Sequence, residues 1–248
     1  GSDINGASSS DYAGTSVAMS SNGTIIAFGA PRYGNYKGLA RVYNWNGSSW
    51  TKVGNDITEN GSSRMGTSVA INDAGTKIVI GGVDGNHNGI VRVYNWNGSS
   101  WTKVGSDISD GVSGHRLGNS VAMNNDGTRF AIGAPYGGNN NYGQKTYSGY
   151  TSVYNWQGSS WNKIGNDIVG GSYDELGTSV AMNDAGDIIA IGAPKDYVNR
   201  GFVRVYQSNG SSWTQVGNNI VGESTNDYSG GSVAMNSSGT RIAIGARY

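Results

Sequence analysis

The sequence predicts an all-β fold, a β-propeller whose blades are four-stranded antiparallel sheets. Three observations lead to this prediction: a unit of about 50 residues recurs along the chain, each unit contains four short β-prone stretches, and the composition favours turns and strands. The chain has 42 Gly and 3 Pro, with 15 Tyr and 7 Trp among its 248 residues. Such a composition suits short strands joined by tight turns, and it disfavours helices, because glycine is a poor helix former.

The repeat is visible as three sequence blocks that return in the same order. The block Ser-Val-Ala begins at Ser16, Ser68, Ser120, Ser179 and Ser232, with spacings of 52, 52, 59 and 53 residues. The block Val-Tyr-Asn-Trp begins at Val42, Val93 and Val153, with a variant at Val205. The block Ser-Ser-Trp ends at Trp50, Trp101, Trp161 and Trp213.

The second unit shows how one repeat divides into strands. We expect strands over residues 68–71, 76–81, 90–96 and 101–104, because β-branched and aromatic residues dominate these stretches. A four-residue turn at 72–75 joins the first two strands, and a variable loop at 82–88 joins the second to the third. Asn97-Gly98 predicts a tight hairpin between the third and fourth strands, since type I′ turns need positive φ at both central residues.

A single sheet of this kind cannot bury both faces, so the units are expected to stack around an axis. Recurrent Gly, Ala and Ser should let neighbouring sheets approach closely, while Trp and Tyr fill the wider space further out. We predict one domain, 1–248, with blades at about 14–57, 66–108, 118–168 and 177–220 and a partial fifth at 230–248, which the N-terminal segment 1–13 accompanies. The partial unit is compatible with a small closing blade, with a piece of a larger ring, or with oligomerisation through the incomplete blade.

Composition excludes several classes of function. Lys+Arg and Asp+Glu each number 17, and no basic patch suited to nucleic acid is apparent. The chain has no cysteine, which excludes disulfides, thiolate metal sites and cysteine nucleophiles. No apolar stretch approaches the length of a membrane span, so membrane insertion is not expected.

Residues 177–194 resemble the FG-GAP repeat of integrin α-subunit propellers, and residues 14–31 and 118–135 are similar to it as well. The resemblance covers nearly the whole chain and implies a propeller used in adhesion or in ligand and glycan binding. The Phe that opens the family motif is replaced here by Ala13, Met65, Leu117, Leu176 and Gly230. Calcium-binding blades of the family carry a longer acidic loop, whereas the turns around Asp73, Asp126 and Asp184 are short, so we expect no metal and no cofactor.

Catalytic motifs are not evident. Gly-Thr-Ser-Val-Ala lacks the second glycine of a nucleophile elbow and lies where a strand is expected. His87 and His115 are the only histidines, and we interpret them as ordinary loop residues. The acidic pair Asp174 and Glu175 is interpreted as a solvated loop. The sequence therefore predicts that the protein is not an enzyme.

The variable loops suggest where a ligand would bind. In an antiparallel blade the short turns lie at one end and the variable connections at the other, and rigid scaffolds commonly carry function on such loops. Tyr, Asn and Gly are abundant in these loops, which suits sugars or adaptable protein contacts and equally suits ordinary turns. Candidate ligand-binding residues are Tyr33, Tyr36, His87, Tyr136, Asn140, Tyr142, Tyr147, Tyr197 and Arg200.

These observations lead to an expected function. We expect a non-enzymatic binding or adhesion module of a lectin-like kind, with a carbohydrate or protein as ligand. The alternative is a structural repeat segment of a larger extracellular or surface protein, with no ligand of its own. Asn-X-Ser/Thr sequons, such as those at Asn46 and Asn97, fit an extracellular or cell-surface location, although turn chemistry alone explains most of them.

Overall fold

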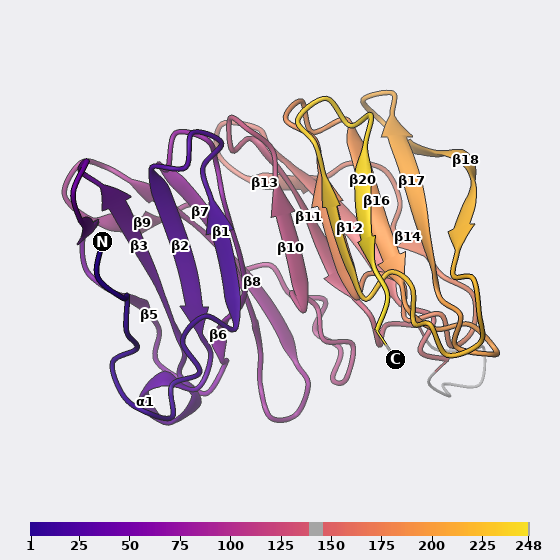
Figure 1. Cartoon of the computed structure of the whole chain (residues 1–248), viewed down its shortest axis with the longest axis horizontal. Helices are drawn as coiled ribbons and strands as arrows, with labels where there is room; N and C mark the ends of the chain where they lie inside the picture. Colours follow the sequence, from indigo (N-terminus) through magenta and orange to yellow (C-terminus); the bar gives the residue numbers. More distant parts are fainter. Residues whose placement is uncertain (139–145, 248) are drawn as a thin grey trace.

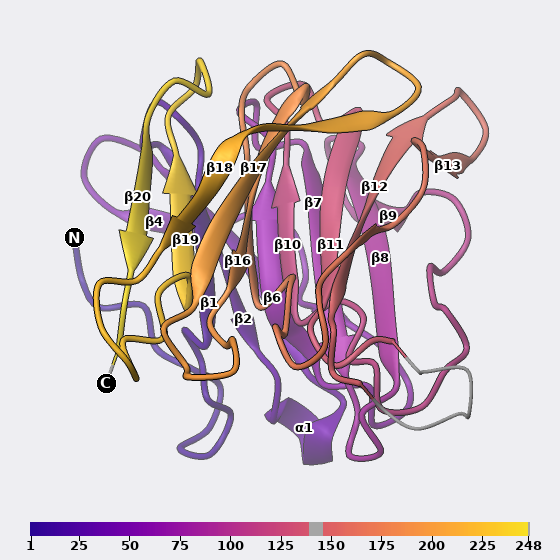
Figure 2. The ribbon, with the colours of Figure 1, turned by 90° about the vertical axis from the view of Figure 1, so that its right-hand side faces the viewer.

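The computed structural model describes residues 1–138 and 146–247, and it confirms an all-β fold of antiparallel sheets. Four sheets have four or five strands each and one has two, and they follow one another along the chain as the repeat predicts. The sheets are arranged around a central axis in the manner of a β-propeller (Figures 1 and 2). We number the sheets first to fifth, in the order of the units.

The strands have the following bounds. The first sheet contains β1 (Ser16–Met19), β2 (Ile25–Ala30), β3 (Leu39–Trp45), β4 (Trp50–Lys52) and β5 (Ile57–Thr58). The second contains β6 (Met65–Ile71), β7 (Lys77–Val83), β8 (Gly89–Trp96) and β9 (Trp101–Lys103). The third contains β10 (Ser120–Met123), β11 (Arg129–Ala134), β12 (Tyr150–Trp156), β13 (Trp161–Lys163) and β14 (Ile168–Val169). The fourth contains β15 (Ser179–Met182), β16 (Ile188–Ala193), β17 (Phe202–Ser208) and β18 (Trp213–Val221). The fifth contains β19 (Ser232–Met235) and β20 (Ile242–Gly245).

The structure refines two of the expected strands. In the second sheet β6 begins at Met65 rather than Ser68, because Met65 pairs with Gly82 across a bulge. The fourth strand is also broken in the first and third units. Gly54 and Gly165 have φ of +71° and +68°, and the chain beyond each returns as β5 or β14 beside the far half of the third strand. In the fourth unit β18 continues through this point with a register shift.

Helix is almost absent, as expected. Among the described residues the helical segment is the single turn α1 (Tyr33–Tyr36), which lies in the loop between β2 and β3. Gly34 and Asn35 inside it have positive φ, so it is a tight turn rather than a regular helix. No helix in the described part of the chain is long and apolar enough to cross a membrane.

Close packing between successive sheets depends on small residues of the first strands. The first strands pack in sequence, β1 on β6, β6 on β10, β10 on β15 and β15 on β19. In each pair the repeated serine donates a hydrogen bond to the carbonyl of the glycine two residues before the next repeated serine. These bonds measure 2.8–2.9 Å and join Ser16 to Gly66, Ser68 to Gly118, Ser120 to Gly177 and Ser179 to Gly230. The predicted close approach through small residues is confirmed.

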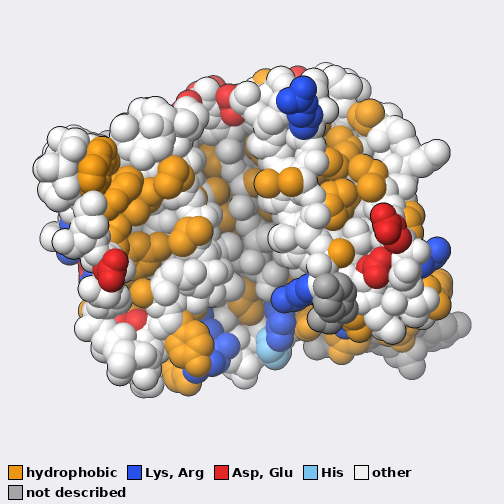
Figure 3. All heavy atoms as spheres, in the orientation of Figure 1, with side chains coloured by type: hydrophobic (Ala, Val, Ile, Leu, Met, Phe, Trp, Pro, Cys, Tyr) orange, Lys and Arg blue, Asp and Glu red, His pale blue; other side chains and the backbone are white. Residues whose placement is uncertain are grey.

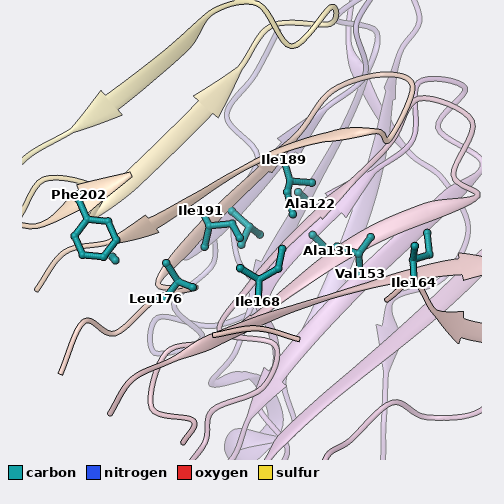
Figure 4. Close-up of a cluster of buried hydrophobic side chains, with 11 residues drawn as sticks. Ala122, Ala131, Val153, Ile164, Ile168, Leu176, Ile189, Ile191 and Phe202 are labelled. Atoms are coloured by element: carbon teal, nitrogen blue, oxygen red, sulfur yellow. The ribbon is translucent and has the colours of Figure 1, made fainter. Parts of the chain in front are cut away.

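Larger side chains fill the space between the sheets. Val69 and Ile71 are buried against Ala27 and Val42 of the preceding sheet. Figure 4 shows the equivalent cluster between the third and fourth sheets, where Ile189 and Ile191 pack with Ala131 and other aliphatic residues. Further out, the indole nitrogens of Trp101 and Trp161 donate to the carbonyls of the preceding unit at 2.9 and 3.0 Å. Each first strand therefore directs Ser and Ala to the following sheet and Val with Met or Ile to the preceding one.

Candidate functional site

The five units place one residue each at the same strained backbone position. This residue lies two positions before the glycine of the repeat, and its φ is positive although it is not glycine. The residues are Tyr12, Arg64, Arg116, Glu175 and Tyr228, with φ between 49° and 57°. Such values are uncommon for non-glycine residues and tend to occur at functional sites.

A local turn maintains this conformation. The hydroxyl of Thr67 donates to the carbonyl of Arg64 at 2.9 Å, and Thr15 and Thr178 make the equivalent bonds to Tyr12 and Glu175. The turn lies directly before the first strand, at the same end of the sheets as α1 and the variable loops (Figure 1). The five positions consequently lie at the loop-bearing end of the propeller, each directly before a first strand.

The first three units form a polar pocket of about 290 Å³ at this end of the propeller, which we call the arginine pocket. Its main lining residues are Tyr12, Thr15, Arg32, Arg64, His87 and Arg116. In Figure 3 basic side chains and a histidine gather at the lower mouth of the hollow between the two halves of the molecule. Arg32 follows β2, whereas Arg64 and Arg116 occupy the strained positions before β6 and β10.

The three guanidinium groups lack acidic partners. Among the ion pairs of the described residues, none involves Arg32, Arg64 or Arg116. They lie instead against aromatic rings, with Arg32 at 3.9 Å from the Tyr12 ring centre and Arg64 at 4.9 Å from that of Tyr36. The buried Nε of Arg64 also has no hydrogen-bond partner within the described residues. Three cations without a counter-charge in one pocket favour an anionic ligand.

His87 lies at the rim of the same pocket. The Nε of Arg116 donates to its Nδ1 at 2.9 Å, which requires that Nδ1 carry no proton. The backbone carbonyl of His87 also accepts hydrogen bonds from the amides of Gly114 and Arg116, so the second and third units are joined here. The imidazole is thus positioned by the same arginine that faces the pocket.

A second pocket, of about 380 Å³, adjoins Arg116 and is lined by tyrosines. Tyr136 and Tyr147 meet edge to face, with ring centres 5.4 Å apart, and the guanidinium of Arg116 lies 4.3 Å from the centre of the Tyr136 ring. Lys195 and Glu175 form an ion pair at 2.8 Å on the wall of this pocket, and the hydrogen bond raises the pKa of Lys195.

The structure brings together some of the predicted ligand residues. Tyr36, His87, Tyr136 and Tyr147 all lie in or beside the two pockets. Tyr33 packs partly against the core of the first sheet. Asn140 and Tyr142 lie outside the described residues.

Two predicted residues lie elsewhere. Tyr197 is 88% exposed, Arg200 pairs with Asp196 of its own loop at 3.2 Å, and neither lines either of these two pockets.

Several residues near the site were missed or misinterpreted from sequence. Arg64, Arg116 and Tyr12 were not selected, although their common position before the repeat glycine could have revealed them. The acidic pair is not a solvated loop, because Asp174 is buried, which raises its pKa, and Glu175 is paired with Lys195.

His115 is also more than an ordinary loop residue. It is buried, its Nδ1 lies 2.7 Å from Asp110, and its Nε2 has no partner in the described structure. No group of three acidic, histidine or cysteine side chains that could hold a metal occurs in the described ranges.

Comparison with known proteins gives fold relatives but no family. No family model and no curated protein matches the sequence. Solved structures do match: hydrazine synthase from Kuenenia stuttgartiensis with a TM-score of 0.60 at 14% identity, a proposed 6-phosphogluconolactonase from Bacteroides uniformis with 0.64 at 8%, and the periplasmic gluconolactonase of Pseudomonas aeruginosa with 0.64 at 11%. Each match covers 94% of this chain and 61–64% of the other. The chain therefore spans about three-fifths of the length of these structures.

These comparisons contradict the expected function. The solved structures that the chain resembles are named as enzymes, two of them as lactonases. The expectation of a non-enzymatic adhesion module is corrected accordingly, together with its alternative of a segment without a ligand. At these identities the likeness establishes the fold alone, and the FG-GAP resemblance is not tested by it and stays a prediction.

Proposed function

We propose that this propeller is a hydrolase that opens the lactone ring of an anionic sugar derivative in the arginine pocket. The observation that carries the proposal is the convergence of Arg32, Arg64 and Arg116, without carboxylate partners, on one pocket that also contains His87. The lactonase names of two fold relatives supply the reaction class. The charge of the pocket supplies the substrate class, a lactone that carries a phosphate or carboxylate group.

The arginines have two tasks in this proposal. A guanidinium group donates two parallel hydrogen bonds to a phosphate or carboxylate, so one or two of the three would bind the anionic group of the substrate. The remaining guanidinium would donate to the carbonyl oxygen of the lactone, where negative charge develops when water attacks. The unpartnered Nε of Arg64 suits either task, because binding would satisfy it.

His87 is the proposed general base. In the hydrolysis, water adds to the lactone carbonyl carbon and one of its protons passes to the imidazole. The imidazolium then gives this proton to the ring oxygen as the C–O bond breaks, which yields a hydroxy acid and restores the neutral imidazole. The Nδ1 that would take this proton accepts a hydrogen bond from Arg116 in the free protein. A bound anion would attract Arg116 and release Nδ1, so substrate binding and activation of the base would be coupled.

The blade arrangement is part of the proposal. We interpret the four larger sheets as four complete blades and the two-stranded fifth sheet as a partial blade. The arginine pocket draws its residues from the first three of these units, so it does not depend on the fifth.

The proposal is tested with 6-phosphogluconolactone and with gluconolactone, followed by acid release against the spontaneous rate. The protein should accelerate opening of the phosphorylated lactone more than that of the neutral one. Arg64→Ala and Arg116→Ala should each lower kcat/KM for the phosphorylated substrate about 10- to 150-fold, the loss of one charge-assisted hydrogen bond. His87→Gln should lower kcat with a smaller effect on KM.

Arg200→Ala is the matched control, because Arg200 is an exposed arginine outside both pockets. It should leave both rates unchanged. Absence of any acceleration over the spontaneous rate for both lactones would refute the proposed function, even if the arginine pocket still bound inorganic phosphate.

A further inference from the structure

The second pocket, beside Arg116, has no part in the proposed hydrolysis, although strained backbone positions surround it. We call it the tyrosine pocket, and it is lined by Tyr136, Tyr147, Tyr173, Glu175 and Lys195. Tyr147, Tyr173 and Glu175 have φ of 46°, 67° and 54°, values that are uncommon for non-glycine residues and that cluster at ligand sites. Three such residues around one hollow of about 380 Å³ point to a binding site.

Backbone hydrogen bonds hold the walls of the tyrosine pocket in place. The amide of Glu175 donates to the carbonyl of Tyr147 at 3.0 Å, and the amide of Tyr173 donates to that of Thr146 at 2.8 Å. These bonds join the loop of the third unit to the turn before the fourth. The pocket is therefore already formed in the free protein, and a ligand would need to order little of the chain on binding.

The two pockets differ in charge. Within the described residues the arginines of the arginine pocket have no acidic partner, whereas Lys195 and Glu175 of the tyrosine pocket form an ion pair at 2.8 Å. The anionic part of a ligand is consequently attracted to the arginine pocket, and a neutral part suits the tyrosine pocket. A cationic group is disfavoured there, because both Lys195 and the guanidinium of Arg116 lie beside the tyrosine rings.

A saccharide ring fits the side chains of the tyrosine pocket. The C–H groups on one face of a sugar pack on an aromatic ring, while its hydroxyls donate and accept hydrogen bonds. Nζ of Lys195 and the carboxylate of Glu175 provide a donor and an acceptor beside the rings. A wholly apolar group would remove this ion pair from water without a new hydrogen bond, which costs free energy. Tyr173, which is 54% exposed, is the most accessible of the three rings for stacking.

Arg116 connects the two pockets. Its side chain lines the arginine pocket, and its guanidinium lies 4.3 Å from the ring centre of Tyr136, which lines the tyrosine pocket. A ligand whose anionic group binds Arg116 therefore has its adjoining part beside the tyrosines. We propose that the tyrosine pocket is a subsite for a second sugar unit, linked by a glycosidic bond to the anionic sugar in the arginine pocket. The inference rests on the proposed function and extends its substrate class to glycosylated anionic lactones.

Isothermal titration calorimetry with sugar acids tests the proposal without any hydrolysis. Gluconate carries the carboxylate alone, whereas cellobionate and maltobionate carry the same gluconate with a β- or α-linked glucosyl group. At least one of the two should bind about 3- to 10-fold more tightly than gluconate, the gain from one stacked ring. Tyr173→Ala should abolish this gain, and Tyr173→Phe, which keeps the ring, should retain most of it. Tyr173 is exposed, so neither change should unfold the protein.

Tyr197→Ala is the matched control, because Tyr197 is 88% exposed and lines neither pocket; it should leave all affinities unchanged. Arg64→Ala should weaken all three acids by a similar factor, since it removes a contact to the carboxylate that they share. The proposal would be overturned by no binding of any of the acids, by equal affinity for all three, by a gain that persists in Tyr173→Ala, or by unchanged affinities in Arg64→Ala.

Failure of this inference is distinguishable from failure of the proposed function. A protein that accelerates lactone opening but binds the three acids equally is a lactonase without the second subsite. A protein that opens no lactone, yet binds a disaccharide acid more tightly through Tyr173, has the saccharide subsite without the proposed hydrolysis.

Discussion

The contact between Gly133 and the following sheet offers a sharp test of how the sheets pack. A Cβ atom at Gly133 would lie 2.0 Å from the carbonyl oxygen of Gly177 and 2.3 Å from Oγ of Ser120. The first of these atoms belongs to the backbone of the next unit, which cannot rotate away as a side chain can. We predict that Gly133→Ala strongly destabilises the protein, although it adds only one methyl group.

The magnitude follows from the geometry. The φ of Gly133 lies outside the left-handed region, so alanine meets no intrinsic backbone strain and the cost is steric. Overpacking of this kind costs about 1–3 kcal/mol, and the shift needed would also break the bond of 2.8 Å between Ser120 and Gly177, a further ~1 kcal/mol. We expect a loss of about 3 kcal/mol, which for a domain of this size corresponds to a fall in Tm of roughly 6–12 °C.

Gly158→Ala is the matched control. Gly158 lies in a hairpin turn with φ of +84°, and nothing would lie within 4 Å of its Cβ. Alanine there should cost about 1–2 kcal/mol, from the left-handed backbone alone. Urea denaturation of both variants measures the difference. If Gly133→Ala lost no more stability than Gly158→Ala, the sheets would not be in the close contact on which this reasoning depends.

Three further predictions concern pH and metal. The hydrogen bond from Arg41 lowers the pKa of Asp56 below 3.8, so the stabilisation by this pair is complete above pH 3.8 and is lost as the pH falls through the lowered pKa. In Asp56→Asn the urea midpoint should therefore change less with pH below pH 3.8 than it does in the wild-type protein. Burial, with the Asp110 carboxylate, raises the pKa of Tyr150 above 10.0, so stability should fall as the pH rises beyond that value, and less in Tyr150→Phe. Excess EDTA should leave Tm unchanged, because the four-residue turns supply too few oxygens for calcium, and a fall of several degrees would contradict this.

The repeat made most of the fold predictable. The serine block and the hairpin signals indicate where strands begin and turn, and these depend on local residues. The break in the fourth strand was harder to predict, because Gly54 and Gly165 act at the middle of an apparently continuous block and Gly217 does not interrupt β18. Whether the chain breaks there depends on pairing with the far half of the third strand, which is a tertiary contact.

The site was less predictable, for a physical reason. Selecting long variable loops led to Tyr197, which is 88% exposed, and to Arg200, which pairs with Asp196 of its own loop. It also led to Asn140 and Tyr142, which lie outside the described residues. Two of the three pocket arginines, Arg64 and Arg116, are instead in short, regular segments before strands. The guanidinium groups converge on one pocket only because the first three units are arranged around a common axis. The sequence alone does not show which end of each segment faces that axis.

The strained position nevertheless offers a way to read such sites from sequence. Its backbone is nearly constant over the units, with φ of 49–57°, whereas its side chain changes from Tyr12 to Arg64, Arg116, Glu175 and Tyr228. A residue selected only for this turn would be glycine or asparagine, which adopt positive φ at little cost. Larger polar side chains stand at all five places, and four of them, Tyr12, Arg64, Arg116 and Glu175, line one of the two pockets. Three lining residues of the arginine pocket, Tyr12, Arg64 and Arg116, come from this one repeat position, so part of the pocket's chemistry follows from which side chains the adjacent units place there.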